Sequence, residues 1–287
     1  MGLFSDILLT VDYDRTLTAP DSTIPERNLE AIRYFLENGG AFTVNTGRSL
    51  PMAQPFKNKV PTNAPLLLYT GAAAYDVQKE ELVFVHEIQL DMWKTVRELL
   101  EMFPDLTVEV QALDKHYNFV PNAAWDAFSA NNCAYATAED GQDLGPFLKF
   151  AIYGEIRDVT VDHLFHGTEE EIRRMDEAEA MLRKTYGDDL AIFRAGPRVI
   201  DVQVAGVSKC RAARELQQRL GRKILVCVGD AENDAGMLEG ADFGFVPADA
   251  ILKDRFPNVC KCADGAVADV IYEKIPRILN LDLDKRG

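Results

Sequence analysis

Hydrophobic positions near both ends of the chain occur as short continuous runs, separated by stretches with helical spacing. The apolar runs cover residues 7–11 and 41–44 and lie within 223–230. Continuous runs of this length are typical of strands that are buried on both faces of a parallel sheet. Residues 25–38 carry apolar side chains three or four positions apart, and residues 208–221 run from a candidate N-cap serine to a glycine, so both are expected to be helices.

Strand, helix and strand in this order predict a parallel α/β core. The core is expected to contain five further segments, namely an amphipathic stretch at 52–59, an apolar run at 65–76, a helix within 231–241, a strand at 242–246 and a final helix at 268–279.

The middle of the chain has a different pattern, beginning near residue 87. Hydrophobicity alternates at 106–113, 190–196 and 199–206, which predicts strands with one solvated face, as in antiparallel sheets. Residues 115–120 and 147–154 are expected to be strands too, and 90–104 and 168–187 to be helices. We therefore expect a core made of residues 1–85 and 206–287, interrupted by an inserted α+β domain at 86–205.

Composition and charge exclude several classes of protein. The formal net charge of the 287 residues is −15, which argues against non-specific binding to nucleic acid or to an anionic membrane. No apolar run is long enough to cross a bilayer, and the N-terminal residues lack the basic segment of a signal peptide. The five cysteines are scattered, so we expect reduced thiols in a cytoplasmic protein. The sequence carries no signal for an oligomeric state.

Each of three predicted core strands ends in residues that could bind a metal ion or a phosphate group. These residues, with a lysine that opens the helix before the third strand, are Asp12, Asp14, Thr46, Gly47, Arg48, Lys209, Asp230, Asn233 and Asp234. Strand ends of a parallel sheet share one edge, where ligands bind. Clustered carboxylates repel one another, and a cation with a preference for oxygen ligands, such as Mg²⁺, removes that repulsion. With a hydroxyl, backbone N–H groups and a lysine nearby, this set suits phosphoryl transfer to an aspartate.

The motifs DYDRTLT (12–18), NTGRS (45–49), GVSK (206–209) and VGDAEND (228–234) occur in this order. Through these motifs the sequence resembles the haloacid dehalogenase superfamily, in particular the Cof-type phosphatases with a C2B cap. The resemblance covers nearly the whole chain. The resemblance implies a Rossmann-like parallel-sheet core in which the inserted domain is the cap.

The resemblance also implies residue roles. Asp12 would be the nucleophile that forms an aspartyl-phosphate, and Asp14 the general acid and then the general base. Mg²⁺ would be held by Asp12, the backbone carbonyl of Asp14, and Asp230. Asp234 would complete the metal site or orient Lys209 from behind.

The remaining motif residues would contact the substrate. Thr46 and Gly47 would bind phosphoryl oxygens, Lys209 would neutralise charge on Asp12 and the phosphate, and Asn233 would contact the phosphate or a metal-bound water. Arg48 could reach the substrate or could pair with a carboxylate, since both uses suit a guanidinium group.

The sequence departs from the family pattern at Arg15, where glycine is commonest, and at Thr70, where asparagine is usual. The leading hypothesis is a Mg²⁺-dependent phosphatase acting on a small phosphorylated metabolite, with a sugar phosphate as the favoured substrate. The alternatives are a phosphomutase or phosphotransferase of the same superfamily, a signalling receiver module, and a relative that binds phosphate without turnover. We expect the four histidines, which are His86, His116, His163 and His166, to be ordinary surface or loop residues, because a zinc site needs three or four ligands.

Overall fold

The computed structural model describes residues 2–120, 123–130, 133–139, 141–155 and 166–279. The chain divides into two compact units. The first, here called the core unit, consists of Met1–Gly47, Phe56–Phe84 and Ser208–Gly287. The second, the inserted unit, consists of Arg48–Pro55 and Val85–Val207. The segment Arg48–Pro55, which was expected to belong to the core, thus groups with the inserted unit.

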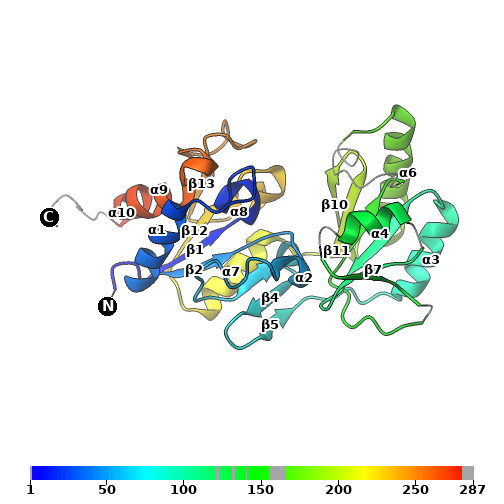
Figure 1. Ribbon diagram of the computed structural model, residues 1–287, viewed down its shortest axis with the longest axis horizontal. Coiled ribbons are helices and arrows are strands. Elements are labelled where there is room, and N and C mark those ends of the chain that lie inside the picture. The colour runs from blue at the N-terminus through cyan, green and yellow to red at the C-terminus, as the bar shows by residue number, and fades with distance from the viewer. Residues whose placement is uncertain (1, 121–122, 131–132, 140, 156–165, 280–287) are drawn as a thin grey trace. The chain divides into compact units, whose positions relative to one another are not determined.

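The core unit is built on a five-stranded parallel sheet with the order β14-β13-β12-β1-β2 (Figure 1). Its strands are β1 (Ile7–Val11), β2 (Ala41–Val44), β12 (Ile224–Val228), β13 (Phe243–Pro247) and β14 (Asn258–Val259). Every residue of β1 and β2 is buried, as the continuous apolar runs predicted. The parallel sheet confirms the α/β prediction, whereas the short β14 was not foreseen.

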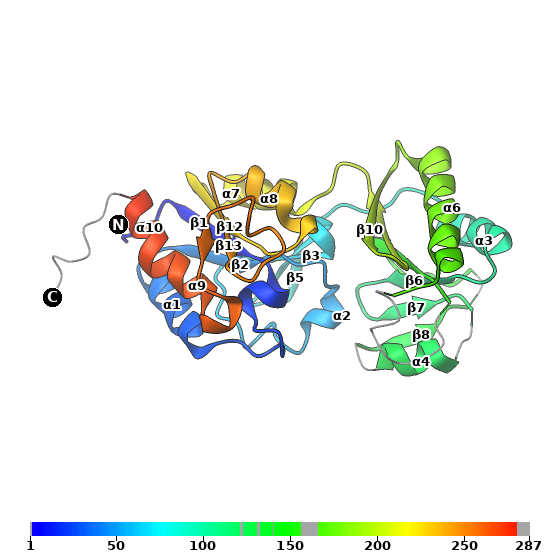
Figure 2. The same ribbon diagram turned by 90° about the horizontal axis from the view of Figure 1, so that it is seen from above.

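Helices cover both faces of this sheet. Figure 2 shows α7 (Lys209–Arg219) and α8 (Ala235–Glu239) on one face, and α1 (Glu26–Glu37), α9 (Ala266–Asp269) and α10 (Ile275–Ile278) on the other. The predicted cap of α7 is present, because Ser208 Oγ accepts a hydrogen bond from the backbone N–H of Arg211 at 3.1 Å. None of the helices among the described residues is long and apolar enough to cross a membrane.

Residues 50–85 differ from expectation. The amphipathic stretch forms only a single turn of helix, α2 (Leu50–Ala53), with Pro55 close behind it. The apolar run breaks into β3 (Leu66–Leu68) and β4 (Ala73–Asp76), which pair antiparallel and join β5 (Glu81–Val85) in a separate three-stranded sheet. The break falls at Tyr69 and Thr70, whose φ values of 52° and 55° end the extended strand.

The inserted unit contains a six-stranded sheet with the order β10-β11-β9-β6-β7-β8. Its strands are β6 (Thr107–Gln111), β7 (His116–Asn118), β8 (Tyr135–Thr137), β9 (Lys149–Tyr153), β10 (Leu190–Gly196) and β11 (Val199–Val204). Neighbouring strands are antiparallel except β7 and β8, which are parallel. The helices α3 (Met92–Met102) and α6 (Glu169–Tyr186) pack apolar side chains such as Val96, Leu99 and Leu182 against one face of this sheet. Strand β8 and helix α4 (Ala123–Ala130) were not predicted.

The other face of this sheet carries polar side chains, and the expectation of a solvated face is wrong for its central strands, although Phe193 on β10 is exposed there. Buried polar residues alternate along the strands, namely Glu109, Gln111, His116, Asn118, Lys149 and Gln203. They bond to neighbours instead of bulk water; for example, Lys149 Nζ lies 2.6 Å from Asp201 Oδ2. The expectation of an ordinary surface or loop histidine is likewise wrong for His116, which is 3% exposed on β7. His163 lies outside the described residues.

Candidate active site

Three carboxylates meet where β1 and β12 end. The two strands pair in parallel with Val11 opposite Val228, and the N–H of Asp12 donates to the carbonyl of Val228 at 2.9 Å. This register brings Asp12 beside the loop that follows β12. Asp12, Asp230 and Asp234 each offer one carboxylate oxygen, and these three atoms lie within 4.8 Å of one another. All three side chains are buried, and Asp234 is completely so.

Lys209, the first residue of α7, lies between two of these carboxylates. Its Nζ donates to Asp12 Oδ1 at 2.5 Å and to Asp234 Oδ1 at 2.7 Å. Burial alone would lower the pKa of Lys209, but Asp12 and Asp234 raise it above the usual value, so the ammonium stays charged. A buried cation with two carboxylate partners provides a fixed positive charge at the strand ends.

Asp234 shapes the loop as well as holding Lys209. Its second oxygen, Oδ2, accepts hydrogen bonds from the backbone N–H groups of Asp230 at 3.1 Å and Ala231 at 3.2 Å. Gly229 allows this close approach, because a Cβ at that position would lie 2.6 Å from both Cβ and Cγ of Asp234. Both oxygens of Asp234 are therefore engaged within the protein.

The carboxylates hold more negative charge than Lys209 balances. Burial raises the pKa of Asp12 to about 8 even though Lys209 lowers it, and Asp234 raises it further. Burial and Asp234 likewise raise the pKa of Asp230 to about 6, against the lowering effects of Thr16, Lys209 and Arg15. A divalent cation that prefers oxygen ligands would stabilise the ionised forms, so this donor set fits Mg²⁺.

The turn after β2 lies next to these strand ends in the sheet order. The N–H of Asn45 donates to Val11 O at 2.8 Å, and the N–H of Thr46 to Leu67 O at 2.9 Å. The side chain of Asn45 also donates from Nδ2 to Lys209 O at 3.0 Å, which ties the turn to the start of α7. Asn45 belongs to the NTGRS motif, but the motif alone did not predict this contact. Gly47 ends the core-unit segment and Arg48 begins the inserted unit.

The remaining predicted residues lie on loops. Asp14 is part of the kinked turn Tyr13–Leu17 and is partly exposed, while Asn233 is exposed in the short 3-10 turn Glu232–Asp234 after β12. In the same turn as Asp14, Thr16 Oγ1 donates to Asp230 Oδ1 at 3.1 Å. Sequence reasoning missed this contact, for which the only signal was a hydroxyl residue inside the first motif.

The departures from the family pattern at Arg15 and Thr70 fall on left-handed backbone. Arg15 has φ 56° and ψ 9°, and Thr70 has φ 55° and ψ 30°. This conformation is strained for most residues and most of all for β-branched ones. Glycine and asparagine adopt it readily. Arg15 and Thr70 therefore add backbone strain, but they leave the carboxylates and Lys209 of the site in place.

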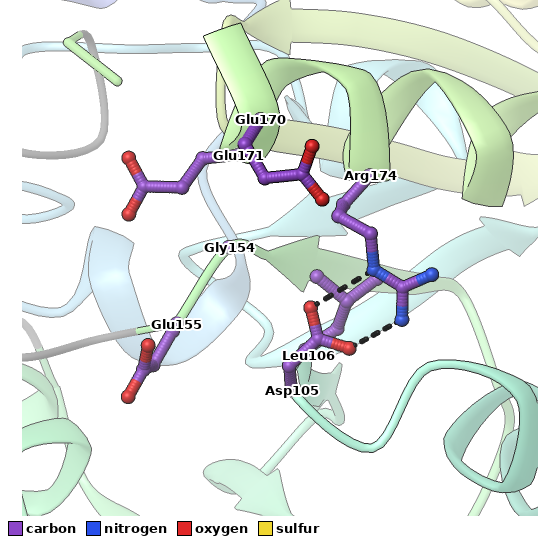
Figure 3. A pocket seen from close by; sticks show the side chains of 7 residues that line it. All are labelled: Asp105, Leu106, Gly154, Glu155, Glu170, Glu171 and Arg174. Atoms are coloured by element: carbon purple, nitrogen blue, oxygen red, sulfur yellow. Dashed lines mark hydrogen bonds and ion pairs between the residues drawn. The ribbon is translucent and has the colours of Figure 1, made fainter. Parts of the chain in front are cut away.

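A separate hollow in the inserted unit does not suit a phosphate. Figure 3 shows its lining, which consists of Asp105, Leu106, Gly154, Glu155, Glu170, Glu171 and Arg174. Arg174 is already paired with Asp105, through Nη2 at 2.6 Å and Nε at 3.2 Å. The excess of carboxylates would repel an anion.

Comparisons with known proteins show the family of the chain. A family model described as haloacid dehalogenase-like hydrolase matches residues 9–271. The chain is 24% identical to an HMP-PP phosphatase of Klebsiella pneumoniae, over 96% of each chain. It is 23% identical to a 5-amino-6-(5-phospho-D-ribitylamino)uracil phosphatase of Bacillus subtilis, over 85% of this chain and 84% of the relative.

Solved structures share the fold. A haloacid dehalogenase-like hydrolase from Bacteroides thetaiotaomicron superimposes with a TM-score of 0.76 at 20% identity, covering 94% of this chain and 98% of its own. A subclass IIB sugar phosphatase gives a TM-score of 0.72 at 17% identity, covering 93% and 99%. These similarities confirm the predicted fold class, a Rossmann-like parallel core with an inserted α+β domain.

Proposed function

The chain belongs to the haloacid dehalogenase-like hydrolase family and is an enzyme of that family, and from this premise we propose that it is a Mg²⁺-dependent phosphatase. The proposed substrate is a small phosphorylated metabolite, with sugar phosphates as the favoured class. The names of the relatives support this breadth, since they include phosphatases for HMP-PP and for a ribitylaminouracil phosphate.

The observation that carries the proposal is the buried pairing of Asp12 with Lys209 beside Asp230. Lys209 contacts Oδ1 of Asp12 and fixes that carboxylate at the end of β1. Fixing a nucleophile before the substrate arrives removes part of the entropic cost of reaction. We assign attack on phosphorus to the other oxygen of Asp12, Oδ2. Lys209, the Thr46 hydroxyl and the Gly47 N–H would stabilise negative charge on the transferring group.

The proposed reaction has two displacements. In the first, an Asp12 oxygen forms a bond to phosphorus, the ester P–O bond breaks, and Asp14 gives its proton to the leaving alkoxide. In the second, Asp14 takes a proton from water, the water oxygen bonds to phosphorus, and the Asp12 carboxylate is released with inorganic phosphate. The partial exposure of Asp14 fits a group that must meet both the leaving group and water.

The metal site is assigned to Asp12, Asp230 and the backbone carbonyl of Asp14. When bound there, Mg²⁺ would supply positive charge that offsets the negative charge of the carboxylates and the phosphoryl group. We assign Asp234 to positioning Lys209 and the β12 loop, because both of its oxygens already accept hydrogen bonds.

The test is phosphate release from a panel of aryl and sugar phosphates, with Mg²⁺ and with EDTA. We expect release that depends on Mg²⁺, and none from Asp12→Asn, because an amide cannot attack phosphorus. Asp264→Asn, an exposed acidic residue of the core unit, is the matched control and should behave like the wild type. No release from any member of the panel would favour a relative that binds phosphate without turnover.

A further inference from the structure

A buried chain of three polar side chains lies within the inserted unit. Ser49 Oγ lies 2.7 Å from His116 Nε2, and His116 Nδ1 lies 3.0 Å from Glu109 Oε1. The exposed fractions of Ser49, His116 and Glu109 are 0%, 3% and 2%. Ser49 comes two residues after Gly47, on the short segment that groups with this unit, while the other two residues lie on β7 and β6.

The order serine, histidine and carboxylate matches a hydrolytic triad, but the surroundings exclude that role. Ser49 is fully buried, and its Oγ already accepts a hydrogen bond from the N–H of Met52 at 3.3 Å. Burial lowers the pKa of His116, but Glu109 and Cys133 together raise it to about 9. The ring is therefore an imidazolium at neutral pH, which cannot take a proton from serine but can donate from Nε2 to Ser49 Oγ.

The carboxylate end of the chain is held equally firmly. Glu109 Oε1 also accepts from Gln111 Nε2 at 3.1 Å and from the Tyr153 hydroxyl at 3.3 Å. The other nearby charges on this face, Lys149 and Asp201, pair with each other. A charge-assisted hydrogen bond in such a buried setting is stronger than one between neutral groups.

We propose that His116 is a positioning residue that, by holding Ser49, fixes the start of α2 and the segment Arg48–Pro55, which follows the Thr46–Gly47 turn directly in the chain. The assignment of that turn to phosphoryl binding rests on the function proposed above. A helix of four residues is too short to be stable alone, so α2 needs an anchor outside itself. Ser49 caps this helix, and His116 holds the cap.

Two substitutions separate the two contacts of His116. The asparagine amide reaches about as far as Nδ1, so His116→Asn keeps a donor for Glu109 and loses Ser49. The glutamine amide reaches about as far as Nε2, so His116→Gln keeps a donor for Ser49 and loses Glu109. Both remove the ring and its charge. Ser49→Ala removes the shared hydroxyl, and His166→Asn, an exposed histidine of the same unit, is the control.

Two readouts apply to every variant. Hydrogen exchange of a peptide covering residues 46–56 reports on the segment without any need for activity. Steady-state kinetics on an aryl phosphate with Mg²⁺ separate KM from kcat. For His116→Asn and Ser49→Ala we expect faster exchange and a rise in KM of about tenfold, the scale of one lost charged hydrogen bond, with a smaller change in kcat. His116→Gln should raise KM clearly less than His116→Asn does, because a hydrogen bond to Ser49 remains although it has lost its charge.

The proposal is overturned if His116→Asn and His116→Gln shift exchange and KM equally, because both would then act only through lost packing and charge. It is also overturned if Ser49→Ala leaves both readouts at the wild-type level, and this variant decides the matter should the histidine variants fail to fold. A wild-type protein that releases no phosphate contradicts the proposed function, and the exchange data alone then judge the positioning role.

Discussion

Asp234→Asn should destabilise the metal-free protein although it replaces only one carboxylate oxygen with an NH₂ group. The carboxylate accepts from Lys209 Nζ through Oδ1 and from two backbone N–H groups, those of Asp230 and Ala231, through Oδ2. An asparagine has one oxygen and one NH₂ group at these places. In either orientation its NH₂ faces a donor, so a buried donor loses its partner.

The magnitude follows from these contacts. Losing a charge-assisted hydrogen bond to Lys209 costs about 1.5–3 kcal/mol, and a buried donor left without a partner costs about 1–3 kcal/mol. Removing one carboxylate also relieves repulsion, since Asp234 helps to raise the pKa values of Asp12 and Asp230. Allowing for that relief, we expect the free energy of unfolding to fall by about 2–4 kcal/mol.

The assay is urea unfolding at neutral pH in EDTA, followed by circular dichroism. The control is Glu273→Gln, which removes an exposed ion pair to Arg277 at 3.2 Å and should cost no more than about 0.5 kcal/mol. If Asp234→Asn unfolds within about 1 kcal/mol of the wild type, the reasoning that Asp234 anchors both Lys209 and the β12 loop is wrong.

Asp14→Asn should lower kcat/KM by on the order of a hundredfold or more, the usual scale for losing a general acid–base. Arg15→Gly should change kcat/KM by less than roughly tenfold, because glycine accepts the left-handed φ of 56°; an equal loss in both variants would make Arg15 a substrate-binding residue. Mg²⁺ affinity, measured by titration calorimetry, should rise as the pH increases from about 6 to about 8, because bound metal needs Asp12 and Asp230 ionised and their pKa values are raised to about 8 and about 6. By the same linkage, the metal-free protein loses stability as the pH rises through this range, since the folded state binds these protons more tightly than the unfolded chain. Affinity that stays flat with pH would contradict the assigned ligands.

The parallel core could be predicted because its strands are buried on both faces and leave continuous apolar runs. The residues 7–11 and 41–44 read as strands for that reason, and the structure has β1 and β2 there. The run at 65–76 was harder, because periodicity does not show where a chain turns. Its break depends on left-handed residues at Tyr69 and Thr70, neither of which is a typical residue for that conformation.

The carboxylates and Lys209 could be proposed from the sequence because they follow strands that share one edge. The supporting contacts could not, because they join residues far apart in the chain. Thr16 reaches Asp230 over 214 positions, and Asn45 reaches Lys209 over 164. His116 was missed for a related reason, since an alternating strand predicts a solvated polar face and gives no sign that the face is buried.

The most direct test of Asp12 as the nucleophile is to locate a phosphoryl mimic on the protein. Beryllofluoride with Mg²⁺ forms an adduct with a carboxylate nucleophile, and a crystal structure of the treated protein would show which residue carries it. We expect the adduct on Asp12, with Lys209 and the Thr46–Gly47 turn around its fluorines. An adduct on Asp14 would contradict the assignment of Asp12 as the nucleophile. Beryllofluoride bound elsewhere, with Asp12 unmodified and still paired with Lys209, would contradict it too.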